Sequence, residues 1–161
     1  MRSRAIAAAL FCLVAMSSHT YADEAKRNIL GLSPGMSQSD ADRVVEGHKW
    51  NCDLSEYGGF ATRDCIINEA NFEKIVVYFN TSRPNHPVFR IRAVGTVSFK
   101  QILDDVGRPA DIEGEGFHTW QFGNELELEL MEIVDKTELS LSQLEFSPAT
   151  NNRKHRPPAE K

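Results

Sequence analysis

The sequence has no apolar run long enough to cross a membrane. A transmembrane helix needs about 20 consecutive apolar residues, and the stretch from Ala5 to Met16 is shorter than that. It follows Arg2 and Arg4 and precedes Thr20-Tyr21-Ala22, which places small residues where a signal peptidase cuts. We therefore expect a signal peptide over residues 1–22, cleavage near Ala22, and a periplasmic or secreted protein without a membrane span.

Cysteine is also scarce. Cys12 lies inside the apolar run after Leu10-Phe11, whereas a lipoprotein signal would place small residues before a cysteine at the cleavage point, so no lipid anchor is expected. Cys52 and Cys65 remain after processing, and an even number of cysteines in an oxidising compartment predicts a disulfide. The alternative, a metal site that adds His48, lacks a fourth ligand at a recognisable spacing.

Motifs of the common enzyme classes are missing. The chain has no serine elbow, phosphate-binding loop or dinucleotide fingerprint, and the histidines His48, His86 and His118 are scattered. His118 shares strand parity with Trp120 and Phe122, which favours a packed core histidine. An enzyme that uses His118 and nearby carboxylates is the alternative. We therefore expect a protein without catalysis and without a cofactor, and an unusual enzyme class stays open.

Acidic residues exceed basic ones. Cleavage near Ala22 would leave 16 Lys and Arg against 23 Asp and Glu, a formal charge of −7, which argues against nucleic acid as a partner. The loop that carries Asp111, Glu113 and Glu115 could offer oxygen ligands to calcium, but it lacks the EF-hand spacing. A solvated loop is the alternative interpretation.

Two helices are predicted by the same start signal. Ser37 with Asp40 and Ser98 with Gln101 have the spacing of an N-cap and its N3 partner. Gly47 and Gly107 are expected to end these helices. Three strand-like segments follow each helix, and a tight hairpin is expected at Gly123-Asn124; the segments are 60–67, 74–79, 88–94, 117–122, 125–131 and 138–146.

The predicted fold class is therefore α+β. Two helix-plus-meander units, residues 29–94 and 95–146, would form an internal repeat in one domain over 29–146, with the helices on one face of an antiparallel sheet. The parity of apolar residues shifts within 138–146, which predicts a bulge. Residues 23–28 are expected to be a polar lead, and residues 147–161 a disordered basic tail.

Short motifs in the chain resemble a family of small periplasmic proteins. The motifs are Gly31-Leu32-x-x-Gly35-Met36-Ser37, Leu103-x-x-Val106-Gly107-x-Pro109 and Thr119-Trp120. This pattern is similar to the outer-membrane-assembly lipoprotein (BamE/OmlA) type and the β-lactamase-inhibitor-protein type. The resemblance implies helices packed on an antiparallel sheet and action by binding other proteins, although the chain lacks the lipoprotein cleavage motif.

Two loops are the predicted contact surfaces. The segment from Asn80 to Pro87 contains Arg83, Pro84 and His86, and its two prolines would lower the entropy lost on binding. The second segment contains Tyr57 and Phe60 around two glycines. For each of them an ordinary surface loop is the simpler interpretation.

We therefore expect an exported, non-catalytic module that binds another envelope or secreted protein, for example as an accessory of envelope assembly. The alternative is an inhibitor or immunity protein against a secreted hydrolase.

Overall fold

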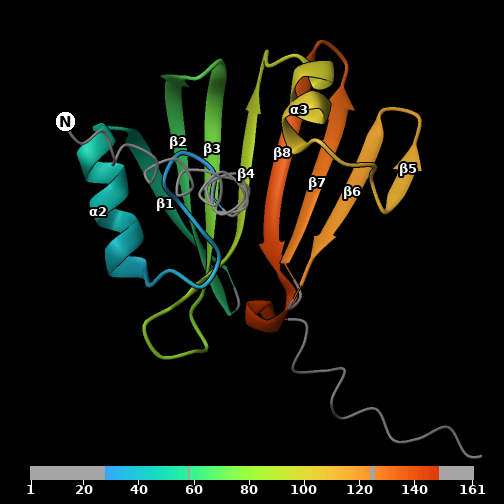
Figure 1. Cartoon of the computed structure of the whole chain (residues 1–161). Coiled ribbons are helices and arrows are strands. Elements are labelled where there is room, and N and C mark those ends of the chain that lie inside the picture. Colours follow the sequence, from blue (N-terminus) through green and yellow to red (C-terminus); the bar gives the residue numbers. More distant parts are fainter. Residues whose placement is uncertain (1–27, 58, 124–125, 149–161) are drawn as a thin grey trace, which may run out of the picture.

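The computed structural model describes residues 28–57, 59–123 and 126–148 (Figure 1). The expected signal peptide, most of the polar lead and most of the basic tail lie outside these residues. The described residues form two short helices, eight strands and one 3₁₀ turn, in the order α2 (Gln38–His48), β1 (Asn51–Tyr57), β2 (Phe60–Glu69), β3 (Phe72–Asn80), β4 (Val88–Gly95), α3 (Phe99–Val106), β5 (Ile112–Gly114), β6 (Phe117–Phe122), β7 (Leu126–Ile133), β8 (Lys136–Gln143) and η1 (Leu144–Phe146).

All eight strands belong to one antiparallel sheet, in the order β1-β2-β3-β4-β8-β7-β6-β5. The predicted fold of two helix-plus-meander units is therefore wrong: a continuous sheet dominates the structure, and β4 pairs directly with β8 at its centre. Separate units would leave the backbone donors and acceptors of β4 and β8 unpaired at two edges, and their pairing satisfies both strands.

Two strands were not predicted, and one predicted bulge is wrong. The outermost strands β1 and β5 were not expected, because β1 is mostly polar and β5 has only three residues. The shift of parity after Leu141 is not a bulge: β8 ends at Gln143, and residues 144–146 form a 3₁₀ turn. A turn changes the side-chain period in the same way as an inserted strand residue, so the apolar pattern could not distinguish the two.

The helix starts are confirmed. The Ser37 hydroxyl accepts a hydrogen bond from the Asp40 amide at 3.2 Å, and the Ser98 hydroxyl accepts one from Gln101 at 3.4 Å. Gly107 ends α3 in the left-handed conformation, as predicted. Gly47 does not end α2; the helix continues to His48, and Lys49 takes the left-handed position.

The disulfide between Cys52 and Cys65 is present, with an S–S distance of 2.02 Å. These cysteines are direct register partners on β1 and β2. The bridge therefore fastens the edge strand β1 to the sheet.

Both helices lie on one face of the sheet, as Figure 1 shows. Asp42 of α2 pairs with Arg63 of β2, and Phe99 of α3 contacts His118 of β6. Strand register places Arg63 and His118 on the same side, which we call the helix face. Its row across the sheet is Arg63, Val77, Ile91, Leu141, Leu128 and Trp120.

Most of the core lies on this helix face. Ala41 and Val45 of α2 and Ile102 and Val106 of α3 are buried with the apolar side chains of the strands. Side chains alternate along a strand, so the residues between these positions point to the opposite side. We call that side the open face, because no helix of the described residues packs on it.

None of the described helices is long and apolar enough to span a membrane.

Candidate functional site

Three aromatic side chains form a cluster on the open face. The ring centroids of Phe60, Tyr78 and Phe89 are 6.5 Å (Phe60 to Tyr78), 6.4 Å (Phe60 to Phe89) and 5.9 Å (Tyr78 to Phe89) apart. Residue Phe89 reaches this side because the register shifts beside it, where Tyr78 pairs with Arg90 and Phe79 pairs with Val88. All three side chains are only partly buried. Aromatic pairs at such separations attract one another, so the cluster is a firm apolar platform.

Charged side chains stand in two columns next to this cluster. Arg90 and Arg92 project from β4, and Glu127 and Glu129 project from β7, with the small residues of β8 between them. Two rows cross the open face: Thr62, Tyr78, Arg90, Ser142, Glu127 and Gln121 form one, and Asp64, Val76, Arg92, Ser140, Glu129 and Thr119 form the next.

One ion pair joins the two columns across β8, and a second pairs Arg92 with β8 itself. Arg90 donates to Ser140 at 2.8 Å and to Glu129 at 3.0 Å. Arg92 donates to Glu138 at 2.5 Å, and the side chain of Glu138 is only 8% exposed. This network fixes the arginines on a face that no helix of the described residues covers.

Two members of the network have perturbed titration. Burial raises the pKa of Glu129, the Arg90 guanidinium opposes this rise, and the nearby carboxylates of Glu127 and Glu138 add to it. The hydrogen bond to Glu138 raises the pKa of Arg92, against the effect of burial. The acidic column is thus crowded with like charge.

The charge balance of these rows leaves one acidic side chain without an ion pair. Their basic side chains are all paired, because the neighbouring Lys74 also meets Asp64 at 2.8 Å. The Glu127 carboxylate has no ion pair or hydrogen bond among the described residues, although the Glu127 backbone belongs to the strand ladder. A basic group on a binding partner would therefore find Glu127 available beside the aromatic platform.

The predicted binding loops are only partly brought to this site. Phe60 belongs to the aromatic cluster, and Tyr57 ends β1, but its side chain lies outside the description. Arg83 instead donates to the Glu145 carbonyl at 2.5 Å and lies over the Phe146 ring at 5.4 Å. The loop that contains Arg83 is thus fastened to the 3₁₀ turn.

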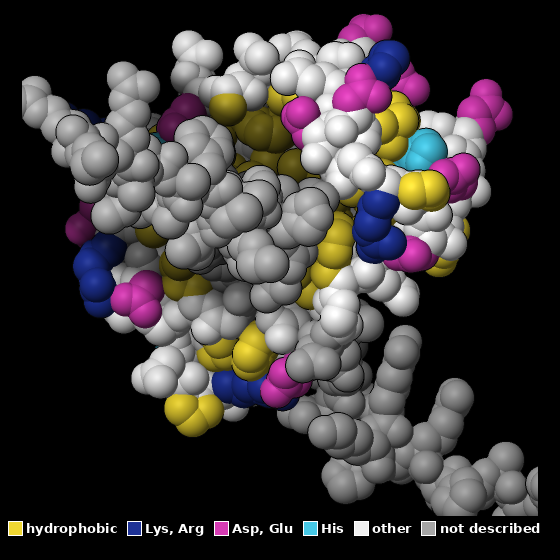
Figure 2. Space-filling view, viewed as in Figure 1, with side chains coloured by type: hydrophobic (Ala, Val, Ile, Leu, Met, Phe, Trp, Pro, Cys, Tyr) yellow, Lys and Arg dark blue, Asp and Glu magenta, His cyan; other side chains and the backbone are white. Residues whose placement is uncertain are grey.

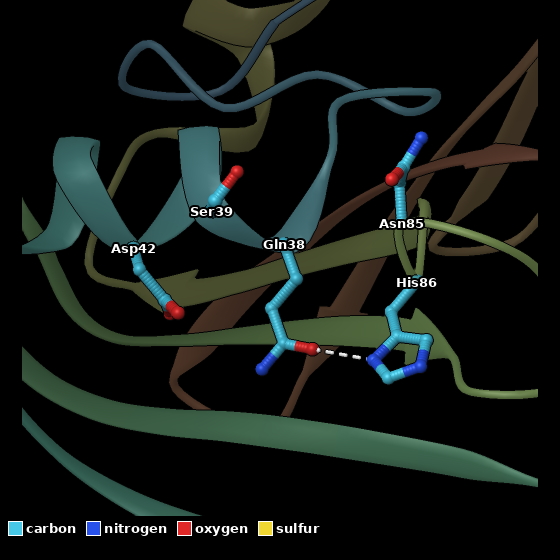
Figure 3. Close-up of a pocket in the computed structure, with 5 residues that line it drawn as sticks. All are labelled: Gln38, Ser39, Asp42, Asn85 and His86. Carbon is cyan, nitrogen blue, oxygen red and sulfur yellow. Dashed lines mark hydrogen bonds between the residues drawn. The ribbon is translucent and has the colours of Figure 1, made fainter.

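Another predicted residue of that loop, His86, lies toward α2. A polar recess of about 360 Å³ lies between this loop and the start of α2. It is lined by Gln38, Ser39, Asp42, Asn85 and His86 (Figure 3). The His86 ring nitrogen Nδ1 lies 2.9 Å from the Gln38 side-chain oxygen. Asp42 is held by two contacts to Arg63, at 3.0 and 3.2 Å. Pro84 is exposed at the tip of the loop. The polar groups of the recess are engaged with the protein itself, so it offers few free groups to a ligand.

The candidate catalytic and metal residues do not assemble either. His118 is half-buried between Phe99 and Trp120, at 5.3 and 5.9 Å between ring centroids, and its Nδ1 has no hydrogen-bond partner among the described residues. His48 meets Glu69 at 2.9 Å, and both cysteines of the hypothetical metal site are consumed by the disulfide. Among the described residues, no group of three or more potential metal ligands is placed to hold an ion.

The acidic loop is tied to the sheet. Asp111 accepts hydrogen bonds from Arg108 at 3.3 and 3.1 Å and from the Gln121 amide at 2.6 Å. These donors lower the pKa of Asp111, the Gln121 amide most. The hydrogen bonds of the Asp111 carboxylate therefore connect this loop to β6, which disfavours the calcium interpretation.

Sequence reasoning missed Tyr78, Phe89 and the charge columns as a site. The signal was present in the alternation of Arg90 and Arg92 with apolar residues, and of Glu127 and Glu129 with leucines. What could not be read was that β8 inserts between the two strands and brings their charges into register.

Comparison of the chain with protein-family models, with curated proteins and with solved structures finds no match in any of the three. The resemblance to the small periplasmic proteins therefore stays a prediction.

Proposed function

We propose that this protein is an exported, non-catalytic module that binds another protein through the open face of its sheet. The observation that carries the proposal is the cluster of Phe60, Tyr78 and Phe89, which lies partly exposed beside Arg90 on a face that no helix of residues 28–148 covers. Tyrosine, phenylalanine and arginine are enriched at protein interfaces, and arginine and tyrosine dominate binding hot spots.

The proposed partner presents basic side chains. The arginines of the face are already paired with carboxylates, whereas Glu127 is not, so a lysine or arginine of the partner would gain an ion pair without displacing one. The same cation would also be attracted by the faces of the aromatic rings. A basic region of an envelope protein or of a secreted hydrolase meets this description.

Site-specific cross-linking tests the proposal. A photoreactive phenylalanine analogue placed at Phe89 should capture a partner from periplasmic extract. The same analogue at Leu54 should not, although Leu54 is 63% exposed, because it belongs to the helix face. The identity of the captured protein then distinguishes an assembly accessory from a hydrolase inhibitor.

Affinity measurements with the captured protein provide the second step. Phe89→Ala should weaken its binding about 30-fold, the loss of about 2 kcal/mol typical of a hot-spot residue. Leu54→Ala, the matched control, should change the affinity less than about twofold. Equal effects of both variants, or capture from Leu54 alone, would place the interface elsewhere.

A further inference from the structure

The tail after Pro148 has the chemistry that the open face would recognise. Residues 149–161 carry Arg153, Lys154, Arg156 and Lys161 against the single acid Glu160, a formal charge of +3. Residues 28–148 carry 10 basic and 20 acidic residues, a formal charge of −10. The charges of the chain are thus segregated between an acidic folded part and a basic tail.

The described chain also ends close to the relevant part of the face. The Phe146 carbonyl accepts a hydrogen bond from Asn80 at 2.8 Å, and Asn80 is the register partner of Phe60 in the aromatic cluster. On the other side, Glu127 is the register partner of Ser142, four residues before Phe146. The chain therefore leaves the sheet at the end where the aromatic cluster and Glu127 lie.

Chain length permits the contact. Arg153 is five residues beyond Pro148, so it can lie up to about 17 Å from it. The strand β7 pairs with β8, and paired strands lie about 4.8 Å apart, so Glu127 is well within this reach. A segment attached this closely has an effective concentration in the millimolar range, so contacts that together give a dissociation constant of about 1 mM would keep it bound about half of the time.

A second acidic area is less suited. Figure 2, which views the helix face, shows acidic side chains around α3 and toward β5. Asp104 there is paired with Lys100, and Asp111 with Arg108. In addition, the segment that leads into α3 lies beside the start of β8, where the Thr137 hydroxyl donates to the Val97 carbonyl at 2.8 Å. The length of β8, about 25 Å, separates that end from the point where the tail begins.

We propose that the basic segment Arg153–Arg156 of the chain's own tail docks on the open face beside Glu127 and the aromatic cluster, where a binding partner must displace it. This contact rests on the proposed function, because it would regulate the access of a partner to the same face. Its test needs no partner, so failure of one proposal can be told from failure of the other.

Nuclear magnetic resonance of the exported protein and of a form that ends at Pro148 tests the docking. Backbone amide shifts should differ between the two at Tyr78, Phe89, Arg90 and Glu127. The differences should vanish when salt is raised from about 0.05 M to about 0.5 M, because the Debye length falls below the reach of surface ion pairs. They should also be lost in a tail variant with Arg153→Gln, Lys154→Gln and Arg156→Gln.

A matched pair of charge variants tests the position. A peptide of residues 149–161 added to the shortened protein should bind about two- to fivefold more weakly to Glu127→Gln, as expected for one exposed ion pair. Asp105→Asn removes the same charge from α3, on the helix face, and should leave the affinity unchanged.

Identical amide spectra of the two forms would overturn the proposal, and so would shifts confined to α3 and β5. Binding of the tail to phosphatidylserine vesicles without any shift on the open face would instead assign the tail to an anionic lipid surface.

Discussion

Gly95→Ala should be strongly destabilising, because β3 and β4 approach each other too closely for a side chain there. A methyl group at Gly95 would lie 2.1 Å from the Asn71 carbonyl oxygen and 2.6 Å from the Cα of Phe72. Both neighbours are backbone atoms, so the strands themselves must separate by about 1 Å to restore a normal contact distance. That movement would also break the hydrogen bond from the Thr96 amide to the Asn71 carbonyl, which is 2.9 Å long.

The cost combines two contributions. Overpacking a core typically costs about 1–3 kcal/mol, and the lost hydrogen bond adds about 1 kcal/mol. We expect a loss of about 3 kcal/mol in the free energy of unfolding, which lowers the midpoint of thermal unfolding by about 10 °C for a domain of this size. Gly95 ends the strand that carries Arg90 and Arg92, so the change should also loosen the open face.

Urea unfolding followed by circular dichroism measures this effect, and Gly47→Ala is the control. Gly47 lies inside α2 with no atom within 4 Å of an added methyl group, so alanine there should stabilise by about 0.5–1 kcal/mol through helix propensity. If Gly95→Ala lost less than about 1 kcal/mol, or if the two variants behaved alike, the close approach of β3 and β4 would be refuted.

Three further predictions concern the ion pairs and the disulfide. Arg92→Leu should lower the free energy of unfolding by about 2–3 kcal/mol, because it leaves the buried carboxylate of Glu138 without its partner. Glu138→Gln should lower it by less than about 1 kcal/mol, because Arg92 is 39% exposed and can be solvated by water. Equal losses in urea titrations would refute this asymmetry. The exported protein should have a mass two hydrogens below that of the dithiol form. Reduction should remove about 3 kcal/mol of stability, given the 13-residue separation of Cys52 and Cys65, and should weaken partner binding. Two free thiols in the exported protein would contradict this prediction. Asp111→Asn should lower the free energy of unfolding at pH 7. Because the pKa of Asp111 is lowered in the folded protein, the difference between the two proteins should persist above the unfolded pKa of about 3.9 and disappear as the pH falls through the folded pKa. A stability difference that is still present at the lowest pH would refute this prediction.

Part of the candidate site could be predicted from residues alone. Phe60 was expected as a contact residue from its place in a glycine-rich segment, and it does lie in the aromatic cluster. Arg83 and His86 were expected on a stiff loop, but their side chains bond to Glu145 and Gln38. A sequence shows that a loop is polar, but whether its polar groups are already satisfied depends on which distant segments pack against it.

Local chemistry by itself determined the helix starts, the disulfide and the core strands of this protein. An N-cap serine bonds to an amide three residues away, and alternation fixes which side chains share a face, so both are encoded within a few neighbouring residues. Tertiary structure alone decided that β4 pairs with β8 and merges eight strands into one sheet. That pairing joins residues about 50 positions apart, and it depends on satisfying the backbone of both strands rather than on any local preference. It also sets Arg90 and Arg92 opposite Glu129 and Glu138, and so creates the open face on which the proposed function rests.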